Sequence, residues 1–296
     1  MSRFALGAIL AVLTTAAFGG QAQAMIDDKD IAKVVSFGGS CAKCELSGRK
    51  LVGATFMGAN FIQANLSGAD LRGAVFHGSN LSGADLSRAD LRGAELFGTR
   101  FVGANFTGAR MDGVEGAGAV FIRANLTKVS ATGAELPAAD FSGAILAGAN
   151  FSGVDMPHIL AMGVDARGAN FSNAELTGAH LNGGRFQNVS FRGADLSTAD
   201  LSGAIFTGAD FRGAELSRTR LDGADLSSAR GLTQDQLDEA CGDAGARLPP
   251  GLTVRPCKTG GRRVIVVSGV RVPKPPKPPK APRPPAPPKY VTVAGE

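Results

Sequence analysis

Four cysteines are the residues best placed to do chemistry in this chain of 296 residues: Cys41, Cys44, Cys241 and Cys257. The close pair Cys41-x-x-Cys44 has three interpretations, namely a structural disulfide, free or redox-active thiols, and part of a metal site. Haem attachment requires a histidine directly after the second cysteine, and Glu45 stands there instead. A zinc site needs two more ligands nearby and a redox pair needs a thioredoxin-like context, so the pattern favours the disulfide.

Other residue types that carry catalysis are scarce. The chain has 3 His, 1 Tyr and no Trp, whereas Gly reaches 41 and Phe 17. Glycine is about twice as frequent as usual but lacks the three-residue period of collagen. A hydrophobic fraction of 44% is enough for a buried core. We therefore expect a folded protein that is not an enzyme and that holds no cofactor or metal.

The first 24 residues have the features of a targeting signal. Arg3 is followed by an apolar run over residues 4–18, which is too short to span a bilayer comfortably. The small residues Ala22 and Ala24 suggest cleavage after Ala24. The alternative is an uncleaved anchor. Because no other stretch is long and apolar enough for a membrane helix, we expect a periplasmic or secreted protein without a transmembrane segment.

A five-residue repeat fills the middle of the chain. From Leu46 to Leu226 every fifth residue is apolar, and Leu, Phe or Met occupies 33 of the 37 positions. The residue two places earlier is usually Ala, and the residue two places later is Gly in 26 of the 37 units. A period of five fits neither an α-helix nor a continuous strand. It fits a short extended side whose Ala and large residue both point inward, followed by a corner where Gly turns the chain.

This pattern resembles the pentapeptide-repeat family, with the motif A(D/N)LxX, over residues 44–228. The resemblance implies an all-β fold: a right-handed quadrilateral β-helix with four units per 20-residue coil, hence about nine coils. It also implies that an end-to-end homodimer can form. Four large positions depart from the motif, and we expect thin places in the core there: Gly116, Ala131, Ala161 and Ala166.

A period of 20 predicts stacked columns. Phe101, Phe121 and Phe141 fall into one column. A second column holds Phe151, Phe171, Phe191 and Phe211. Stacked identical side chains suit a solenoid core. Near Pro157 we expect a bulge over residues 155–168.

The ends of such a rod need covers, because each terminal coil presents an unpaired strand edge. Residues 31–37 form a short apolar run that fits the first coil. Residues 233–244 predict a short capping helix, with capping-box spacing between Thr233 and Gln236 and an apolar face of Leu237, Ala240, Cys241 and Ala244. If the rod separates its ends by about 40 Å, only the pairs Cys41–Cys44 and Cys241–Cys257 are within reach.

The sequence thus divides into five parts: a signal peptide (1–24), an N-terminal cap segment (25–40), the repeat β-helix (41–228), a capping helix with a disulfide loop (229–258), and a basic proline-rich, disordered tail (259–296).

One outward-facing position holds an acid in seven successive coils. These residues are the candidate interaction surface: Glu95, Glu115, Glu135, Asp155, Glu175, Asp195 and Glu215. Arg92, Arg192 and Arg212 lie three residues upstream, and we expect them to neutralise part of the two ends. The strip from Glu115 to Glu175 should then be the most negative. Crowded carboxylates favour a bound cation or a basic partner, although a plain solvated face is the alternative.

The basic charge of the chain lies in its tail. Residues 44–228 carry a net charge of −3 and residues 258–296 a net charge of +8. The basic residues of the proline-rich stretch are Lys274, Lys277, Lys280, Arg283 and Lys289. This stretch is typical of an extended polyproline spacer. Its partner could be an anionic envelope polymer, a polyproline-binding module or the acidic column of its own chain, and the alternative is a free tail.

These features favour a structural or interaction scaffold: a rigid exported rod with a basic tail that binds envelope polymers or proteins. The alternative comes from the resemblance, since some family members mimic DNA and bind DNA gyrase. Export and a rod charge of only −3 argue against that alternative, and we expect no nucleic-acid partner. His77, His158 and His180 occupy different columns, so neither a metal site nor a catalytic triad is supported.

Overall fold

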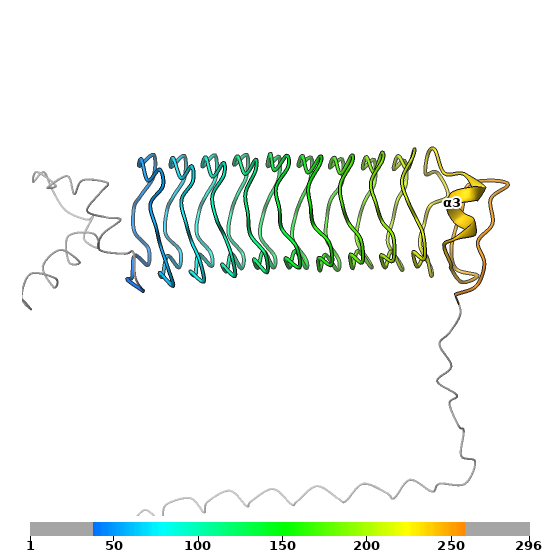
Figure 1. The fold of residues 1–296 in the computed structure, drawn as a ribbon, viewed down its shortest axis with the longest axis horizontal. Helices are drawn as coiled ribbons and strands as arrows, with labels where there is room; N and C mark the ends of the chain where they lie inside the picture. Colours follow the sequence, from blue (N-terminus) through cyan, green and yellow to red (C-terminus); the bar gives the residue numbers. More distant parts are fainter. Residues whose placement is uncertain (1–37, 258–296) are drawn as a thin grey trace, which may run out of the picture. The chain divides into compact units, whose positions relative to one another are not determined.

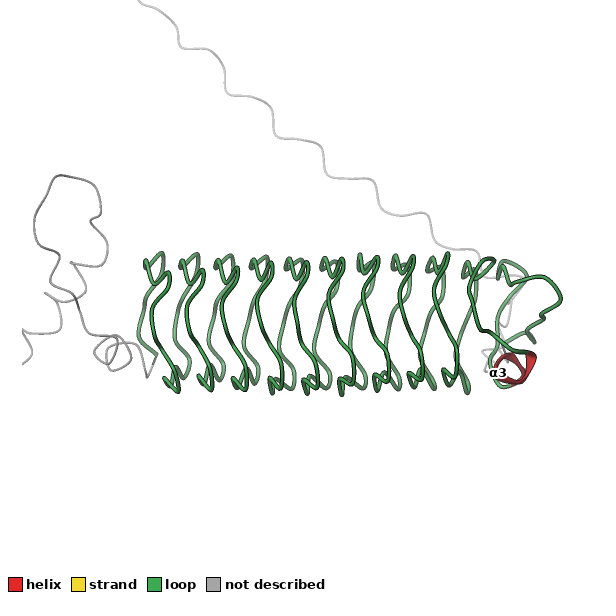
Figure 2. Cartoon of the chain, turned by 90° about the horizontal axis from the view of Figure 1, so that it is seen from above, coloured by secondary structure: helices red, strands yellow, loops and turns green. Residues whose placement is uncertain are grey.

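The computed structural model describes residues 38–257. These residues form a stack of coils that advance along one axis (Figure 1). Within the described part of the chain, the one α-helix is α3, Gln234–Asp238, and the repeat region is drawn as turns and loops (Figure 2). The signal peptide, the cap expected over residues 31–37 and the basic tail lie outside the described residues. No helix between residues 38 and 257 is long and apolar enough to cross a bilayer.

Parallel β-bridges join each coil to the next. One residue in five forms a bridge, and its partner lies 20 residues further along, as in Asn65↔Asp85 and Asp70↔Asp90. A coil therefore has four faces of five residues each, which is the four-sided stack that the family resemblance implies. We number the faces by one coil: face 1 is residues 59–63, face 2 is 64–68, face 3 is 69–73 and face 4 is 74–78. Each face recurs every 20 residues.

The corners explain the glycines. The last residue of each face adopts a left-handed backbone, as at Gly68 with φ of 64°. Glycine takes this conformation without steric cost, whereas other L-residues are strained there. Eleven non-glycine residues of the described chain also adopt it, among them Asn173 and Thr198.

One backbone N–H in each unit is not used by the ladder. This N–H belongs to the residue that follows the large inward residue. It commonly donates a hydrogen bond to the outward side chain two residues earlier in the chain. Ser67 N–H donates to Asn65 Oδ1 at 3.1 Å, for example. Proline lacks only this N–H, so it fits at this position without breaking a bridge. The bulge expected over residues 155–168 was therefore wrong: the bridges Asp155↔Glu175 and Leu160↔His180 continue past Pro157.

The core consists of inward columns of large side chains and alanines. Phe121 stacks on Phe101 and Phe141 with ring centroids 5.0 and 4.8 Å apart. The second predicted column is also present, with centroid separations of 5.2, 5.6 and 5.3 Å from Phe151 to Phe211. The core is not thin at Gly116, because the Leu136 side chain of the next coil occupies the space. A Cβ on residue 116 would lie only 2.9 Å from Leu136 Cδ2.

The C-terminal cover begins with the predicted capping box. The N-cap Thr233 accepts a hydrogen bond from the Gln236 N–H, and the Gln236 side chain accepts one from the Thr233 N–H. The Gln236 amide also donates to the Phe211 and Ala214 carbonyls at 3.0 and 2.7 Å, which satisfies two backbone acceptors at the C-terminal end of the stack. A helical face reaching Ala244 was wrong. Helix α3 ends at Asp238 because Cys241 returns to the ladder, where its N–H donates to the Thr219 carbonyl at 2.9 Å.

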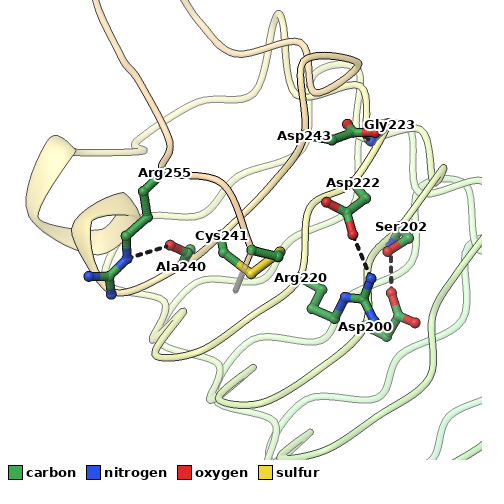
Figure 3. Close-up of a disulfide and its surroundings, with 10 residues drawn as sticks. Asp200, Ser202, Arg220, Asp222, Gly223, Ala240, Cys241, Asp243 and Arg255 are labelled. Carbon is green, nitrogen blue, oxygen red and sulfur yellow. Dashed lines mark hydrogen bonds and ion pairs between the residues drawn. A yellow bond between two sulfur atoms is a disulfide. The ribbon is translucent and has the colours of Figure 1, made fainter. Parts of the chain in front are cut away.

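Two disulfides lie at the two ends of the described stack. Cys41 and Cys44 are buried and bonded across the first corner, with Cα atoms 5.2 Å apart. Cys241 and Cys257 are bonded with Cα atoms 4.6 Å apart. Figure 3 shows the second bond beside Arg255, which donates to the Ala240 carbonyl at 3.3 Å. Both pairings are those predicted.

Candidate functional site

The acidic column lies on face 4, where the ladder sets its residues. Each acid forms a parallel bridge with the acid one coil later, from Glu95↔Glu115 to Asp195↔Glu215. Neighbouring Cα positions in such a ladder are about 4.8 Å apart, so the carboxylates are crowded. Glu115, Glu135, Asp155 and Glu215 are exposed and the other three are half-buried.

The two ends of the acidic column have internal partners. At the N-terminal end, Glu95 Oε2 lies 2.8 Å from His77 Nε2. Toward the C-terminal end, Glu175 accepts a hydrogen bond from the Thr177 hydroxyl, and Asp195 accepts one from the Ser197 N–H at 2.7 Å.

The middle of the acidic column lacks such partners. Glu115, Glu135 and Asp155 form no hydrogen bond or ion pair through their side chains with any residue between 38 and 257. The residues two places later explain this difference. Pro137 and Pro157 have no N–H to donate, and neither proline nor Ala117 carries a hydroxyl. Three neighbouring carboxylates thus face solvent with their hydrogen-bonding capacity free.

The arginines expected to neutralise the ends of the acidic column do not contact it. Arg92 and Arg212 bind Asp90 and Asp210 on face 3, each two residues earlier in the chain. Arg192 lies 4.0 Å from Asp210 as well. Each of these ion pairs forms because the aspartate and the arginine both point outward from face 3. A corner of the coil separates the arginines from the acids of face 4. These ion pairs hold the pKa of Asp90 below its usual value and lower the pKa of Asp210 to about 2, mainly through the arginine hydrogen bonds.

A hollow of about 450 Å³ lies between α3 and the last regular coil. Its lining includes Glu215, Ser217, Asp235 and Glu239. The Ser217 hydroxyl bridges two of these acids, at 3.4 Å from Glu215 and 2.6 Å from Glu239. The negative surface of face 4 therefore extends onto the C-terminal cover.

The remaining chemistry-bearing residues are dispersed. His77, His158 and His180 belong to different columns, as expected. Within residues 38–257, no group of three or more His, Cys, Asp or Glu is arranged to hold a metal ion. All four cysteines are in disulfides, which leaves no thiolate for redox or nucleophilic chemistry in the described chain.

Apolar side chains beside the acidic column were missed by reasoning from the sequence. On face 4, Ala117, Pro137 and Pro157 lie next to Glu115, Glu135 and Asp155. On face 1, which follows around the corner, the outward positions between residues 99 and 163 include five apolar residues: Val102, Val120, Ile122, Leu160 and Met162. The 20-residue period that aligns the acids also aligns these residues, and it would have found them.

Comparison with known proteins identifies the repeat. A sequence model described as pentapeptide repeats matches residues 40–78, 75–113, 119–156, 163–193 and 194–230. A search of curated proteins finds no match. Several solved structures resemble the chain. HetL, a pentapeptide repeat protein involved in heterocyst differentiation regulation in the cyanobacterium Nostoc, is 28% identical, with 70% of this chain and 91% of HetL covered and a TM-score of 0.30.

QnrB1, a plasmid-mediated fluoroquinolone resistance protein, is 23% identical in one trypsin-treated form. That comparison covers 56% of this chain and 89% of QnrB1, with a TM-score of 0.39. A pentapeptide repeat protein of the Arabidopsis thaliana thylakoid lumen is 21% identical over 62% of this chain and 70% of its own, with a TM-score of 0.12.

Proposed function

Because this chain belongs to the pentapeptide-repeat family, we propose that it is a non-enzymatic interaction scaffold, exported from the cytoplasm, that binds a protein partner through the acidic column. One observation carries this proposal: Glu115, Glu135 and Asp155 are adjacent, and their carboxylates have no internal partner in the described chain. Like charges held this close repel one another, and a basic partner relieves that repulsion. The rigid stack keeps the carboxylates in place before binding, which lowers the ordering cost.

A matched pair of variants tests the acidic column. The variant Glu115→Gln, Glu135→Gln and Asp155→Asn removes three charges from its middle. The control Asp85→Asn, Asp200→Asn and Asp222→Asn makes the same change in net charge on other faces. Chemical cross-linking in envelope extract, followed by mass spectrometry, compares the proteins attached to each. A partner retained by the wild type and the control but lost by the first variant supports the proposal, whereas equal capture by all three contradicts it.

Export and the tail are separate parts of the proposal. Intact mass of the protein recovered from cells should correspond to cleavage after Ala24, and recovery of the full chain in the cytoplasm would exclude export. The tail, with a net charge of +8 over residues 258–296, suits anionic envelope polymers. Removing residues 259–296 should then abolish retention on such a polymer at low salt and leave the protein partner of the rod unaffected.

A second candidate is inhibition of a DNA-processing enzyme such as gyrase by mimicry of DNA. The regular ladder of carboxylates is the observation that favours it, because negative charges repeat along a rod. The modest charge of −3 over residues 44–228 weakens it. Inhibition of gyrase supercoiling by the purified protein, lost in the triple variant and kept in its control, would establish this function in place of the first.

A further inference from the structure

The middle of face 1 departs from the rest of that face. Its outward bridge positions hold Asn60 and Asn80 at one end and Asp200 and Arg220 at the other. Between them the apolar Val120 and Leu160 alternate with Arg100, Asp140 and His180. The second outward position is apolar at Val102, Ile122 and Met162, with Ser142 between the last two. It is polar from Asn182 to Asp222, whereas the N-terminal end holds Ile62 and Ser82.

These apolar side chains are not accounted for by the fold. They point away from the core, and Met162 remains 44% exposed. The polar residues at equivalent positions of other coils show that the ladder does not need them. Clustered apolar side chains on an outer face usually mark a surface that another molecule covers.

The borders of this face indicate the chemistry of its occupant. Across the corner from face 1 lie Ala117, Pro137 and Pro157, and beyond them the unpartnered carboxylates of Glu115 and Asp155. Asp140 lies within the face itself, where its carboxylate accepts a hydrogen bond from the Ser142 N–H at 2.9 Å. Two basic residues flank the apolar side chains: Arg100 forms a bridge with Val120 at their N-terminal edge, and Arg123 lies at the opposite corner, over Gly143. An occupant must therefore be apolar where it covers face 1 and positively charged where it reaches face 4.

We propose that the middle of face 1, together with the adjoining strip of face 4, binds an extended protein segment in which apolar side chains alternate with lysine or arginine. This inference rests on the proposed function and specifies its partner. A face is only five residues wide. The apolar side chains from Val102 to Met162 span three coil steps, about 14 Å at 4.8 Å per step, with Asp140 and Ser142 between them. That size suits a single extended segment, whose alternate side chains point to opposite sides.

Labelled peptides test this surface on the full mature chain. One dodecapeptide alternates lysine with valine, a second alternates lysine with serine, and a third alternates glutamate with valine. Fluorescence anisotropy should give at least a tenfold lower Kd for the lysine–valine peptide than for the lysine–serine peptide. The glutamate–valine peptide should bind at least a hundredfold more weakly than the lysine–valine peptide.

Variants that borrow residues from neighbouring coils locate the binding. The first variant replaces four apolar residues with polar ones that stand at the equivalent positions of other coils. Its substitutions are Val120→Asn, Ile122→Ser, Leu160→Asn and Met162→Ser. It should weaken the lysine–valine peptide tenfold and leave the lysine–serine peptide unchanged. The matched control Asn80→Gln and Ser202→Ala, outside the apolar part, should bind both peptides as the wild type does. Circular dichroism and thermal melting verify that each variant is folded.

The possible failures are distinct. Equal Kd values for the two lysine peptides, both weakened by the acidic-column variant, would overturn this inference and leave the proposed function intact. If neither lysine peptide binds, both this inference and the proposed function are overturned for extended basic partners. Sedimentation that shows self-association lost on the face 1 substitutions, with no peptide binding, would assign the face to a second copy of the chain and also overturn the inference.

Discussion

Carboxylates on two neighbouring faces of this rod differ in whether they have an internal partner. On face 3, Asp90 and Asp210 each have an arginine two residues later and form close ion pairs with it. On face 4, Glu135 and Asp155 have a proline two residues later, and their carboxylates remain without an internal partner among the described residues. The backbone geometry is the same in both cases, so the residue two places on decides whether a carboxylate serves the fold or stays available for binding.

The difference shows how a strongly constrained repeat can carry a binding surface. The inward residues and the corners are set by the coil, and they vary little along the described stack. The outward residues differ without any break in the bridges, as the passage of the ladder through Pro157 demonstrates. Outward positions are therefore where the residues of this scaffold can change without disturbing the coil.

The largest effects should come from the core, which faces 3 and 4 share, and should be equal in the middle section (residues 99–163) and the C-terminal section (residues 179–228) of the stack. Phe141 lies at 1% exposure in the middle section and Phe191 at 0% in the C-terminal section. Replacing either with alanine leaves a cavity within a stacked column, and we expect each to lower the free energy of unfolding by about 3–5 kcal/mol. Urea denaturation measures both. A loss below about 1 kcal/mol at one position would show that the two sections differ in their cores and not only in their surfaces.

Substitutions at the corners should change the free energy of unfolding less than core substitutions do. Introducing glycine should raise it, and removing glycine should lower it. Thr198 adopts a φ of 60°, and its β-branched side chain makes that conformation costly. Thr198→Gly should stabilise the protein by about 0.5–1 kcal/mol, since the strain of about 1–2 kcal/mol is partly offset by the entropy of glycine. In the middle section, Gly118→Ala should cost about 1 kcal/mol, because φ is 66° and no neighbouring atom blocks the methyl group.

Thermal or urea unfolding tests both corner changes. No stabilisation by Thr198→Gly, together with no cost for Gly118→Ala, would mean that the left-handed corner does not explain the abundance of glycine.

Much of this fold was predictable because one period governs it. The inward columns, the capping box at Thr233 and both disulfides follow from sequence spacing and reach. Two features did not follow from a pattern. Apolar spacing suggested a longer helix, but the return of Cys241 to the ladder ends α3 at Asp238. Pro157 suggested a bulge, but the N–H it lacks is one that the bridges never use.

The candidate site was predictable in its position but not in its pairing. A 20-residue period was enough to align the seven acids. Whether Arg92 and Arg212 neutralise them depends on which side chains share a face, and the corner between faces 3 and 4 separates them. The apolar residues of face 1 follow from the same 20-residue period, applied to outward apolar residues as well as to inward aromatic and outward acidic ones.

The ion pair on face 3 should contribute modestly to stability, with a defined pH dependence. The Arg212 guanidinium lowers the pKa of Asp210 from 3.8 to about 2. Because the folded-state pKa is the lower one, the contribution is present above about pH 4 and is lost as the pH falls to about 2. Arg212 is largely solvated, so Arg212→Ala should cost less than about 1 kcal/mol at pH 7.

Urea midpoints measured at pH 7 and near pH 2 test the contribution of Arg212. The difference between wild type and variant should shrink at the lower pH. Arg100→Ala is the control, because the Arg100 side chain forms no hydrogen bond or ion pair within the described residues and stands between Asn80 and Val120 in its ladder. A wild-type advantage that persists near pH 2 would assign the effect to packing of the arginine stem.

The smallest effect on stability, and the most direct test of the comparison, is expected at Pro157. Pro157→Ala restores the missing N–H, which should donate to the Asp155 carboxylate as Ser197 donates to Asp195 at 2.7 Å. The free energy of unfolding should change little. The new hydrogen bond contributes about 0.5–1.5 kcal/mol, and the lost proline had contributed about 0.4–1 kcal/mol by restricting the unfolded chain.

Hydrogen exchange and peptide binding measure the new contact. The amide of residue 157 should exchange slowly with solvent, and the double variant with Asp155→Ala should lose that protection. The single variant should also bind the lysine–valine peptide about two- to threefold more weakly, since one carboxylate of the middle section then has an internal donor. Rapid exchange of this amide with unchanged peptide binding would mean that proline does not keep Asp155 available.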